Sequence, residues 1–312
     1  MPVSVVPVID LAAPRAAVVA QVAQAAQTPG FFQVVNAGVV PSLMRETLAI
    51  AQAFFACDSD IKRGVTRTMA NPFGYYDREL TKNLRDRKEI FDFAPSEQTP
   101  WPPQLPALKP ALESFTAACH ALALRLTELL CEGLGAHANG VLPQLCPDHS
   151  SFLRLNHYPV DDLLRGLAPA AGPLGISPHT DAGALTVLLQ DTVAGLQMHC
   201  DGAWLDVPPI ADALTINIGD IWQVWSNDRY TAPLHRVRAS TAEPRLSIAY
   251  FLNPGYQAVI EPLPGQLSAA QPARYRRLPW NEFRELRALG DYGDFGEEVQ
   301  IGDYRVQSSQ AD

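Results

Sequence analysis

Three pairs of polar residues, each with one residue between its members, are the features of this chain best suited to chemistry. The pairs are Asn156 with Tyr158, His179 with Asp181, and Arg245 with Ser247. Residues two apart on an extended strand point to the same face, so both side chains of each pair are directed to one side. With His235, the pairs would give one cavity two imidazoles, a carboxylate, a guanidinium and three hydrogen-bonding groups.

Two histidines and a carboxylate are a ligand set that holds catalytic ferrous iron while leaving coordination positions open. His179, Asp181 and His235 provide this set, and His235 follows Asp181 by 54 residues. Neutral imidazoles suit Fe(II), and the carboxylate offsets part of its charge. A jelly roll would bring the second histidine back beside the first strand. We therefore predict an iron centre with these three ligands.

Arg245 and Ser247 predict a site for an acidic cosubstrate. The planar guanidinium of Arg245 is suited to binding a carboxylate through two parallel hydrogen bonds, and the Ser247 hydroxyl is an additional donor. Taken singly, an H-x-D motif, a histidine or an arginine more often has a structural role. Their combination in this order and spacing favours a functional site. His157 lies between Asn156 and Tyr158 and would point to the other side, so it is not predicted to be a ligand.

Composition limits the classes of protein that fit the chain. At 312 residues, with 47% hydrophobic and 18% charged residues, it can bury a substantial core and is not expected to be disordered. A formal net charge of -9 argues against nucleic acid as a partner. No apolar run is long enough for a membrane helix, and the first residues lack the pattern of a signal peptide. Five widely spaced cysteines, none in a C-x-x-C motif, indicate unpaired thiols in a reducing cytoplasm. We expect a cytoplasmic monomer or weak homodimer whose partner is a small-molecule substrate.

The pattern of apolar and turn residues divides the chain into two regions. Residues 1–150 are predicted to be an N-terminal α/β region, whose long helix over 107–135 packs on the barrel. Residues 58–106, rich in charge, aromatic residues and proline, are predicted to be a long, partly ordered loop. Residues 151–312 are predicted to be a jelly-roll core, because about eight short strands of period two are separated by turn residues. A helix near 281–288 and an acidic tail rich in glycine and tyrosine follow. The predicted fold class is mainly β with flanking helices, around a double-stranded β-helix (jelly roll).

The chain resembles a known family, the isopenicillin N synthase-like branch of the iron(II)/2-oxoglutarate-dependent oxygenases. The resemblance covers nearly the whole chain and begins in the segments 7–11 and 30–36. Its most specific stretches are His179 to Asp191, Asn217-Ile218-Gly219-Asp220, His235-Arg236-Val237 and Arg245-Leu246-Ser247-Ile248-Ala249. One departure is the segment 230–234 before the second histidine, where relatives usually have Lys-Ser. Pro233 removes a backbone donor there, near the expected metal site.

The resemblance also implies roles for the candidate residues. It assigns the three metal ligands named above. It further implies these 2-oxoglutarate contacts: Arg245 and Ser247 for the distal carboxylate, Tyr158 as an assisting group, and Asn156 near the end that chelates iron. Phe251 matches a position where some members place an aromatic ring against the substrate. The segment 73–93 and the C-terminal helix would cover the barrel mouth, which makes Phe73, Tyr75 and Tyr76 candidates for substrate contact.

The activity that the resemblance implies is oxidation, above all hydroxylation, of a C–H bond in a small organic molecule. Dioxygen and 2-oxoglutarate would be the cosubstrates, succinate and carbon dioxide the coproducts, and secondary metabolism the setting. One alternative is an iron-dependent oxidase on the same scaffold that does not use 2-oxoglutarate. Arg245 and Ser247 would then bind the substrate's own carboxylate. A non-catalytic binder of a small acid is a second, less favoured alternative.

Overall fold

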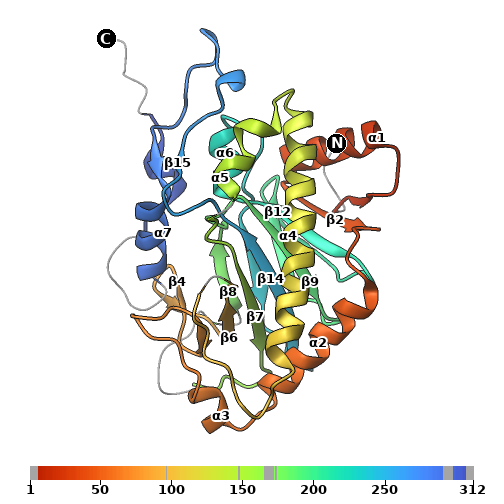
Figure 1. Ribbon diagram of the computed structural model, residues 1–312, viewed down its shortest axis with the longest axis vertical. Coiled ribbons are helices and arrows are strands. Elements are labelled where there is room, and N and C mark those ends of the chain that lie inside the picture. Colours follow the sequence, from red (N-terminus) through yellow and green to blue (C-terminus); the bar gives the residue numbers. More distant parts are fainter. Residues whose placement is uncertain are drawn as a thin grey trace.

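The computed structural model describes residues 6–95, 97–146, 148–164, 172, 174–290 and 298–306. Two β-sheets form the centre of this part of the chain, and helices cover one face of the larger sheet (Figure 1). The predicted acidic tail falls largely on residues 291–297 and 307–312, which lie outside the described residues.

The larger sheet of the described chain contains strands from both predicted regions. In chain order these strands are β1 (Val8–Asp10), β2 (Phe31–Val35), β3 (Gly74–Tyr76), β6 (Glu89–Phe93), β7 (Phe152–Tyr158), β9 (Leu185–Gln190), β12 (Leu214–Ile218) and β14 (Arg245–Leu252). Their order across the sheet is β1-β2-β12-β9-β14-β7-β6-β3. The smaller sheet consists of β8 (Leu174–His179), β10 (Leu196–Cys200), β11 (Ala203–Asp206) and β13 (His235–Arg238), in the order β11-β10-β13-β8. Two further pairs are β4 (Leu80–Thr81) with β5 (Leu84–Arg85), and β15 (Val259–Ile260) with β16 (Leu278–Pro279).

The helices lie around this core. The α-helices are α1 (Arg15–Gln27), α2 (Pro41–Phe55), α3 (Ser59–Arg63), α4 (Leu108–Gly133), α5 (Leu142–Leu145), α6 (Asp220–Trp225) and α7 (Trp280–Leu289). Short 3-10 turns are η1 (Ala138–Gly140), η2 (Pro264–Gln266) and η3 (Ile301–Tyr304). Helix α7 lies beside the β4–β5 hairpin, at the side of the sheets away from α1 and α2 (Figure 1). None of the helices in these described ranges has the length and apolar character that a membrane span requires.

The two faces of β7 and β14 explain how the sheet separates a core from a cavity. These strands pair antiparallel, with Arg245 opposite Tyr158 and Ser247 opposite Asn156. Directly opposite residues share a face, so these four polar side chains point to the same side of the sheet. The intervening apolar residues of both strands point to the other side and join the core that α4 covers: Leu153, Leu155, Ile248 and Tyr250.

Helix α4 is the longest helix of the described chain and the main cover of the outer face. Its apolar residues recur at helical spacing and are buried: Leu112, Phe115, Cys119, Leu122, Leu126, Leu129 and Leu130. The helix also packs against α1 and α2. At Gly133, a Cβ atom would lie 2.5 Å from the Cβ of Ala23, so only glycine permits this approach of α4 to α1.

The structure differs from the sequence prediction between residues 58 and 106. This segment is not one long loop, because it forms α3, β3, β4, β5 and β6. Strand β6 is fully buried and pairs with β7 along its whole length. The sequence of β6 does not have the apolar pattern of a buried strand, because Glu89 and Asp92 are charged. Both residues are nevertheless buried, each in an ion pair. A pattern of hydrophobicity alone does not predict a strand of this kind.

The predicted fold class is confirmed, since facing sheets with flanking helices form the described structure. Strand β7 has the bounds predicted for it, and α4 and α7 lie within two residues of their predicted ends. Strands β1, β2, β3 and β6 complete the same sheet as β7 and β14. We therefore propose that residues 1–150 and 151–312 are two sequence regions of one packed unit.

Candidate metal centre and cavity

His179, Asp181 and His235 converge where β8 and β13 lie side by side. His179 ends β8, and it is paired directly opposite His235, the first residue of β13. Asp181 lies in the loop two residues after β8, so the prediction that it shares one strand with His179 is wrong. Its Oδ1 atom lies 3.7 Å from Nε2 of His179 and 3.6 Å from Nε2 of His235. One ligand atom from each residue lies within 4.8 Å of the other two, which is close enough for all three to bind one metal ion.

Backbone carbonyl groups orient both imidazoles. Nδ1 of His179 lies 2.8 Å from the carbonyl oxygen of Ser177, and Nδ1 of His235 lies 3.1 Å from that of Pro233. A carbonyl only accepts, so each Nδ1 carries the proton and each Nε2 presents a lone pair to the centre. Pro233 has no backbone donor, but its carbonyl performs this function, so the departure noted in the sequence leaves the second histidine oriented.

The second oxygen of Asp181 is held by neighbouring strands. Asn217 on β12 donates from Nδ2 to Oδ2 of Asp181 over 2.7 Å, and the hydroxyl of Thr186 on β9 donates to the same oxygen. Burial alone would raise the pKa of Asp181, but the two histidines and these hydrogen bonds lower it. Burial, and then the neighbouring His235, lower the pKa of His179 to about 3. An ionised carboxylate beside neutral imidazole is the state that binds a metal cation, so the donor set fits Fe(II).

Replacing Asn217 with alanine should weaken Fe(II) binding about 10- to 100-fold, since partners of metal ligands contribute to affinity on this scale. Anaerobic equilibrium dialysis of Fe(II) measures the change. The matched control is Thr215→Ala on the same strand. The Thr215 hydroxyl contacts Gln33 and Gln190 rather than a ligand. Equal Fe(II) affinity in the Asn217 variant and the wild type would show that the amide does not support the metal ligand.

Arg245 is a buried cation that forms no ion pair among the described residues, although Asp191 interacts with it electrostatically at longer range. Its side chain is 1% exposed, and no carboxylate of the described residues lies within 4 Å of it. Nε donates to the carbonyl of Val193, Nη2 to Oε1 of Gln190 at 2.9 Å, and Nη1 to the hydroxyl of Ser247 at 3.3 Å. The guanidinium has five N–H donors, so two remain for a ligand. The guanidinium also lies 5.1 Å from the ring centroid of Tyr158. A buried charge is costly unless it is paired, so the arrangement fits an acidic ligand.

A cavity of about 650 Å³ joins the histidines to Arg245. Its lining includes all seven residues predicted for metal and cosubstrate binding, and it also includes Phe73 and Phe251. Tyr75 and Tyr76 are not in this lining. Tyr75 points to the opposite face of the sheet, where its ring meets Phe54 and its hydroxyl donates to Glu89. The ring of Tyr76 lies 4.2 Å from the guanidinium of Arg67.

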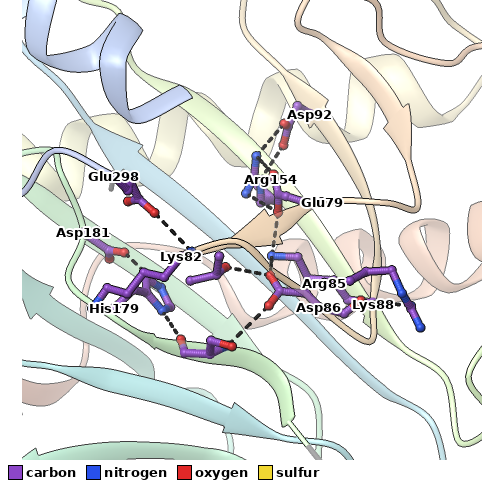
Figure 2. Close-up of polar contacts among 12 residues, drawn as sticks. Glu79, Lys82, Arg85, Asp86, Lys88, Asp92, Arg154, His179, Asp181 and Glu298 are labelled. Carbon is purple, nitrogen blue, oxygen red and sulfur yellow. Dashed lines mark hydrogen bonds and ion pairs between the residues drawn. The ribbon is translucent and has the colours of Figure 1, made fainter. Parts of the chain in front are cut away.

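A buried network of charges lies beside the cavity, and all its members except Asp86 line it; the sequence analysis did not identify this network. Its members are Arg67, Glu79, Asp86, Lys88, Asp92 and Arg154, each at most 15% exposed at the side chain. Figure 2 labels the members other than Arg67. Arg154 lies 2.7 Å from Asp92 and 2.9 Å from Glu79. Lys88 lies 2.6 Å from Glu79 and 3.1 Å from Asp86. One signal was present in the sequence, since Arg154 precedes Asn156 by two positions and so shares its face.

The charge network reaches the strand that carries the first histidine. Asp86 accepts a hydrogen bond from the backbone N–H of Ser177, whose carbonyl orients His179 (Figure 2). Burial would lower the pKa of Lys88, but Glu79 and Asp86 outweigh burial and raise it. Lys88 is therefore a charged group that stabilises two buried carboxylates.

Replacing Lys88 with methionine should lower the free energy of unfolding by about 3–5 kcal/mol, because it leaves the buried Asp86 without the cation that it is paired with. Urea denaturation followed by circular dichroism measures the loss. The control is Lys109→Met, which removes an exposed pair with Glu113 and should cost less than about 0.5 kcal/mol. A Lys88 variant as stable as this control would contradict the structural role of the network.

The C-terminal part of the described chain holds the turn between two of the predicted ligands. On α7, Arg287 donates from Nη2 to the carbonyl of Thr180 over 2.9 Å and pairs with Glu298 at 2.9 Å. Glu298 also accepts from the backbone N–H of Lys82, in the β4–β5 hairpin, as Figure 2 shows. Helix α7 and this hairpin are thereby joined across the cavity mouth.

Comparison with known proteins identifies the family. Residues 149–254 match the 2OG-Fe(II) oxygenase superfamily, and residues 6–111 match the non-haem dioxygenase in morphine synthesis N-terminal family. Flavanone 3-dioxygenase 2 of Oryza sativa subsp. japonica is 33% identical, over 89% of this chain and 82% of its own. Gibberellin 2-beta-dioxygenase 5 of the same plant is 33% identical, and the match covers 96% of this chain and 88% of that protein. The crystal structure of JOX2 in complex with 2OG, Fe and JA has a TM-score of 0.84 and 28% identity, and covers 98% of this chain and 92% of that one.

The chain belongs to the 2OG-Fe(II) oxygenase superfamily. It is an iron(II)- and 2-oxoglutarate-dependent dioxygenase, and so an oxidoreductase. The resemblance, the activity class and the cofactors expected from the sequence are thereby confirmed.

Proposed function

We propose that His179, Asp181 and His235 bind Fe(II), and that Arg245 and Ser247 bind the distal carboxylate of 2-oxoglutarate. Tyr158 assists at that carboxylate, and Asn156 lies near the end of 2-oxoglutarate that chelates iron. The observation that carries the proposal is the buried Arg245 guanidinium, which has no described carboxylate within 4 Å yet shares one cavity with three oriented metal-binding side chains.

The reaction is the oxidation of a C–H bond in a small organic molecule, with hydroxylation as the expected outcome. When bound, Fe(II) with 2-oxoglutarate and dioxygen supplies the oxidising power, and succinate and carbon dioxide are the coproducts. The residues of the chain position the reactants and exclude water. Phe251 is stacked on Phe152 at 4.8 Å between ring centroids, and both line the cavity together with Phe73. These rings are therefore suited to holding the apolar part of the substrate near the metal centre.

We further propose that the chain acts in the cytoplasm as a monomer or a weak homodimer. The five cysteines are free thiols, which is the state that a reducing compartment maintains. Light scattering after size exclusion, at several protein concentrations, determines the oligomeric state. A dimer that persists on dilution would contradict the proposal.

Anaerobic titration with Fe(II) and 2-oxoglutarate tests the proposed function. The complex should give the weak metal-to-ligand charge-transfer band in visible light, and exposure to dioxygen with a substrate should release succinate. Bound iron without this band would favour the oxidase that does not use 2-oxoglutarate. Failure to bind Fe(II) would overturn the assignment of the three ligands.

A further inference from the structure

Within the described ranges, the cavity contains a second arginine that has no carboxylate within 4 Å. Arg284 lies on α7 at the cavity mouth, four residues after Trp280, which lines the same cavity. We propose that Arg284 binds a carboxylate of the primary substrate, so that the enzyme acts on a small organic acid. This inference rests on the proposed function, because the acid would occupy the same cavity as the metal centre.

The other cavity cations are already neutralised or assigned. Arg67, Lys88 and Arg154 are ion-paired with the buried carboxylates of the charge network. Arg287 is paired with Glu298. Arg245 lies deep in the cavity, where the cosubstrate is assigned. Among the described cavity residues, only Arg284 remains as a cation with neither a carboxylate within 4 Å nor a proposed ligand.

The surroundings of Arg284 orient its guanidinium and leave donors available. The side chain is partly buried, and Nη1 donates to the hydroxyl of Tyr256 over 3.3 Å. The guanidinium lies 5.2 Å from the centroid of the Tyr256 ring. The Arg284 guanidinium has five N–H donors, and the hydrogen bond to Tyr256 uses one of them. The other four are available for a contact with a carboxylate through two parallel hydrogen bonds. An oriented arginine of this kind loses little conformational entropy when it binds.

The cavity suggests the shape of the acid. The lining of the cavity that contains Arg284 and the metal centre also includes Phe73 and Phe251. A molecule with an apolar body would therefore place its carboxylate at the mouth and its reactive C–H bond at the opposite end. A single unpaired arginine matches a monoanion rather than a phosphate ester, which would bring additional charge. Glu285 also lines the mouth, but it is exposed, so solvent screens its charge.

Binding of matched acids and esters tests the proposal. The protein is loaded anaerobically with Fe(II) and 2-oxoglutarate, and isothermal titration calorimetry is performed with cyclohexyl, phenyl and naphthyl alkanoic acids and their methyl esters. The best acid should bind about 10- to 100-fold more tightly than its ester, as expected for a hydrogen bond to a charged group. Arg284→Gln should bring this ratio close to one. Glu285→Gln, the matched control on the same helix, should preserve it.

The outcomes separate the inference from the proposed function, because the charge-transfer band is recorded in the same samples. If the band is present but no acid binds more tightly than its ester, the inference is overturned and the proposed function stands. The same holds if Arg284→Gln retains the preference for the acid. If the wild type shows no band, the proposed function fails and the inference fails with it.

Discussion

Replacing Asp181 with alanine should abolish tight Fe(II) binding and, with it, succinate release. The substitution removes the only anionic member of the proposed ligand set and leaves two neutral imidazoles. Partners that merely orient metal ligands contribute about 10- to 100-fold to affinity, so loss of a ligand should weaken Fe(II) binding by at least about 100-fold. Anaerobic equilibrium dialysis and a succinate assay measure the two effects.

The same substitution also deprives Asn217 and Thr186 of their acceptor, so folding has to be measured separately. Leaving buried donors unsatisfied costs about 1–3 kcal/mol, which urea denaturation can detect. Glu113→Ala is the control, because this exposed glutamate on α4 makes only a surface pair with Lys109. An Asp181 variant that is folded and turns over like this control would refute the iron assignment.

Replacing Arg245 with glutamine should raise the Kd of 2-oxoglutarate about 30- to 4,000-fold while the Kd of Fe(II) stays the same. The range corresponds to the loss of about 2–5 kcal/mol when one partner of a buried, hydrogen-bonded charge pair is removed. Arg245→Lys should recover only part of the affinity, because lysine keeps the charge but cannot form the planar, two-pronged contact. Titration of 2-oxoglutarate into the Fe(II)-loaded protein, followed by the charge-transfer band, gives each Kd.

Arg238→Gln is the matched control for Arg245, because Arg238 is an exposed arginine on β13. It should leave the Kd of 2-oxoglutarate at the wild-type value. If Arg245→Gln also leaves this Kd unchanged, the guanidinium does not bind the cosubstrate. The acidic ligand of Arg245 would then have to be the substrate itself, as in an oxidase that does not use 2-oxoglutarate.

The three proposed metal ligands could be selected from the sequence because two of them are close neighbours along the chain. His179 and Asp181 are two residues apart, and strand periodicity placed Arg245 with Ser247 and Asn156 with Tyr158 on common faces. The approach of His235 to His179 depends on the tertiary fold, and the predicted jelly roll accounted for it. The bounds of β7 followed from the same period of two.

The rest of the cavity was not predictable because it depends on partners distant in sequence. Whether Glu79 is exposed or buried is decided by Arg154, which lies 75 positions further along the chain. Three aromatic candidates were named in the segment that covers the mouth, but the sequence did not indicate which face of β3 points inward. Tyr75 consequently meets Phe54 rather than a substrate. The role of Arg287 at Thr180 likewise depends on how α7 packs.

The cavity is built from two kinds of segment, and this division has an evolutionary consequence. The proposed metal and cosubstrate residues lie on or next to the long strands of the two sheets, whereas much of the mouth comes from the β4–β5 hairpin and α7. Mutations in the hairpin or on the exposed face of the helix can alter which molecule enters without disturbing the iron ligands. The Arg287 contact limits this freedom, because a change there reaches the turn between His179 and Asp181. New substrates should therefore arise most readily by variation at positions such as Arg284, with Arg287 kept constant.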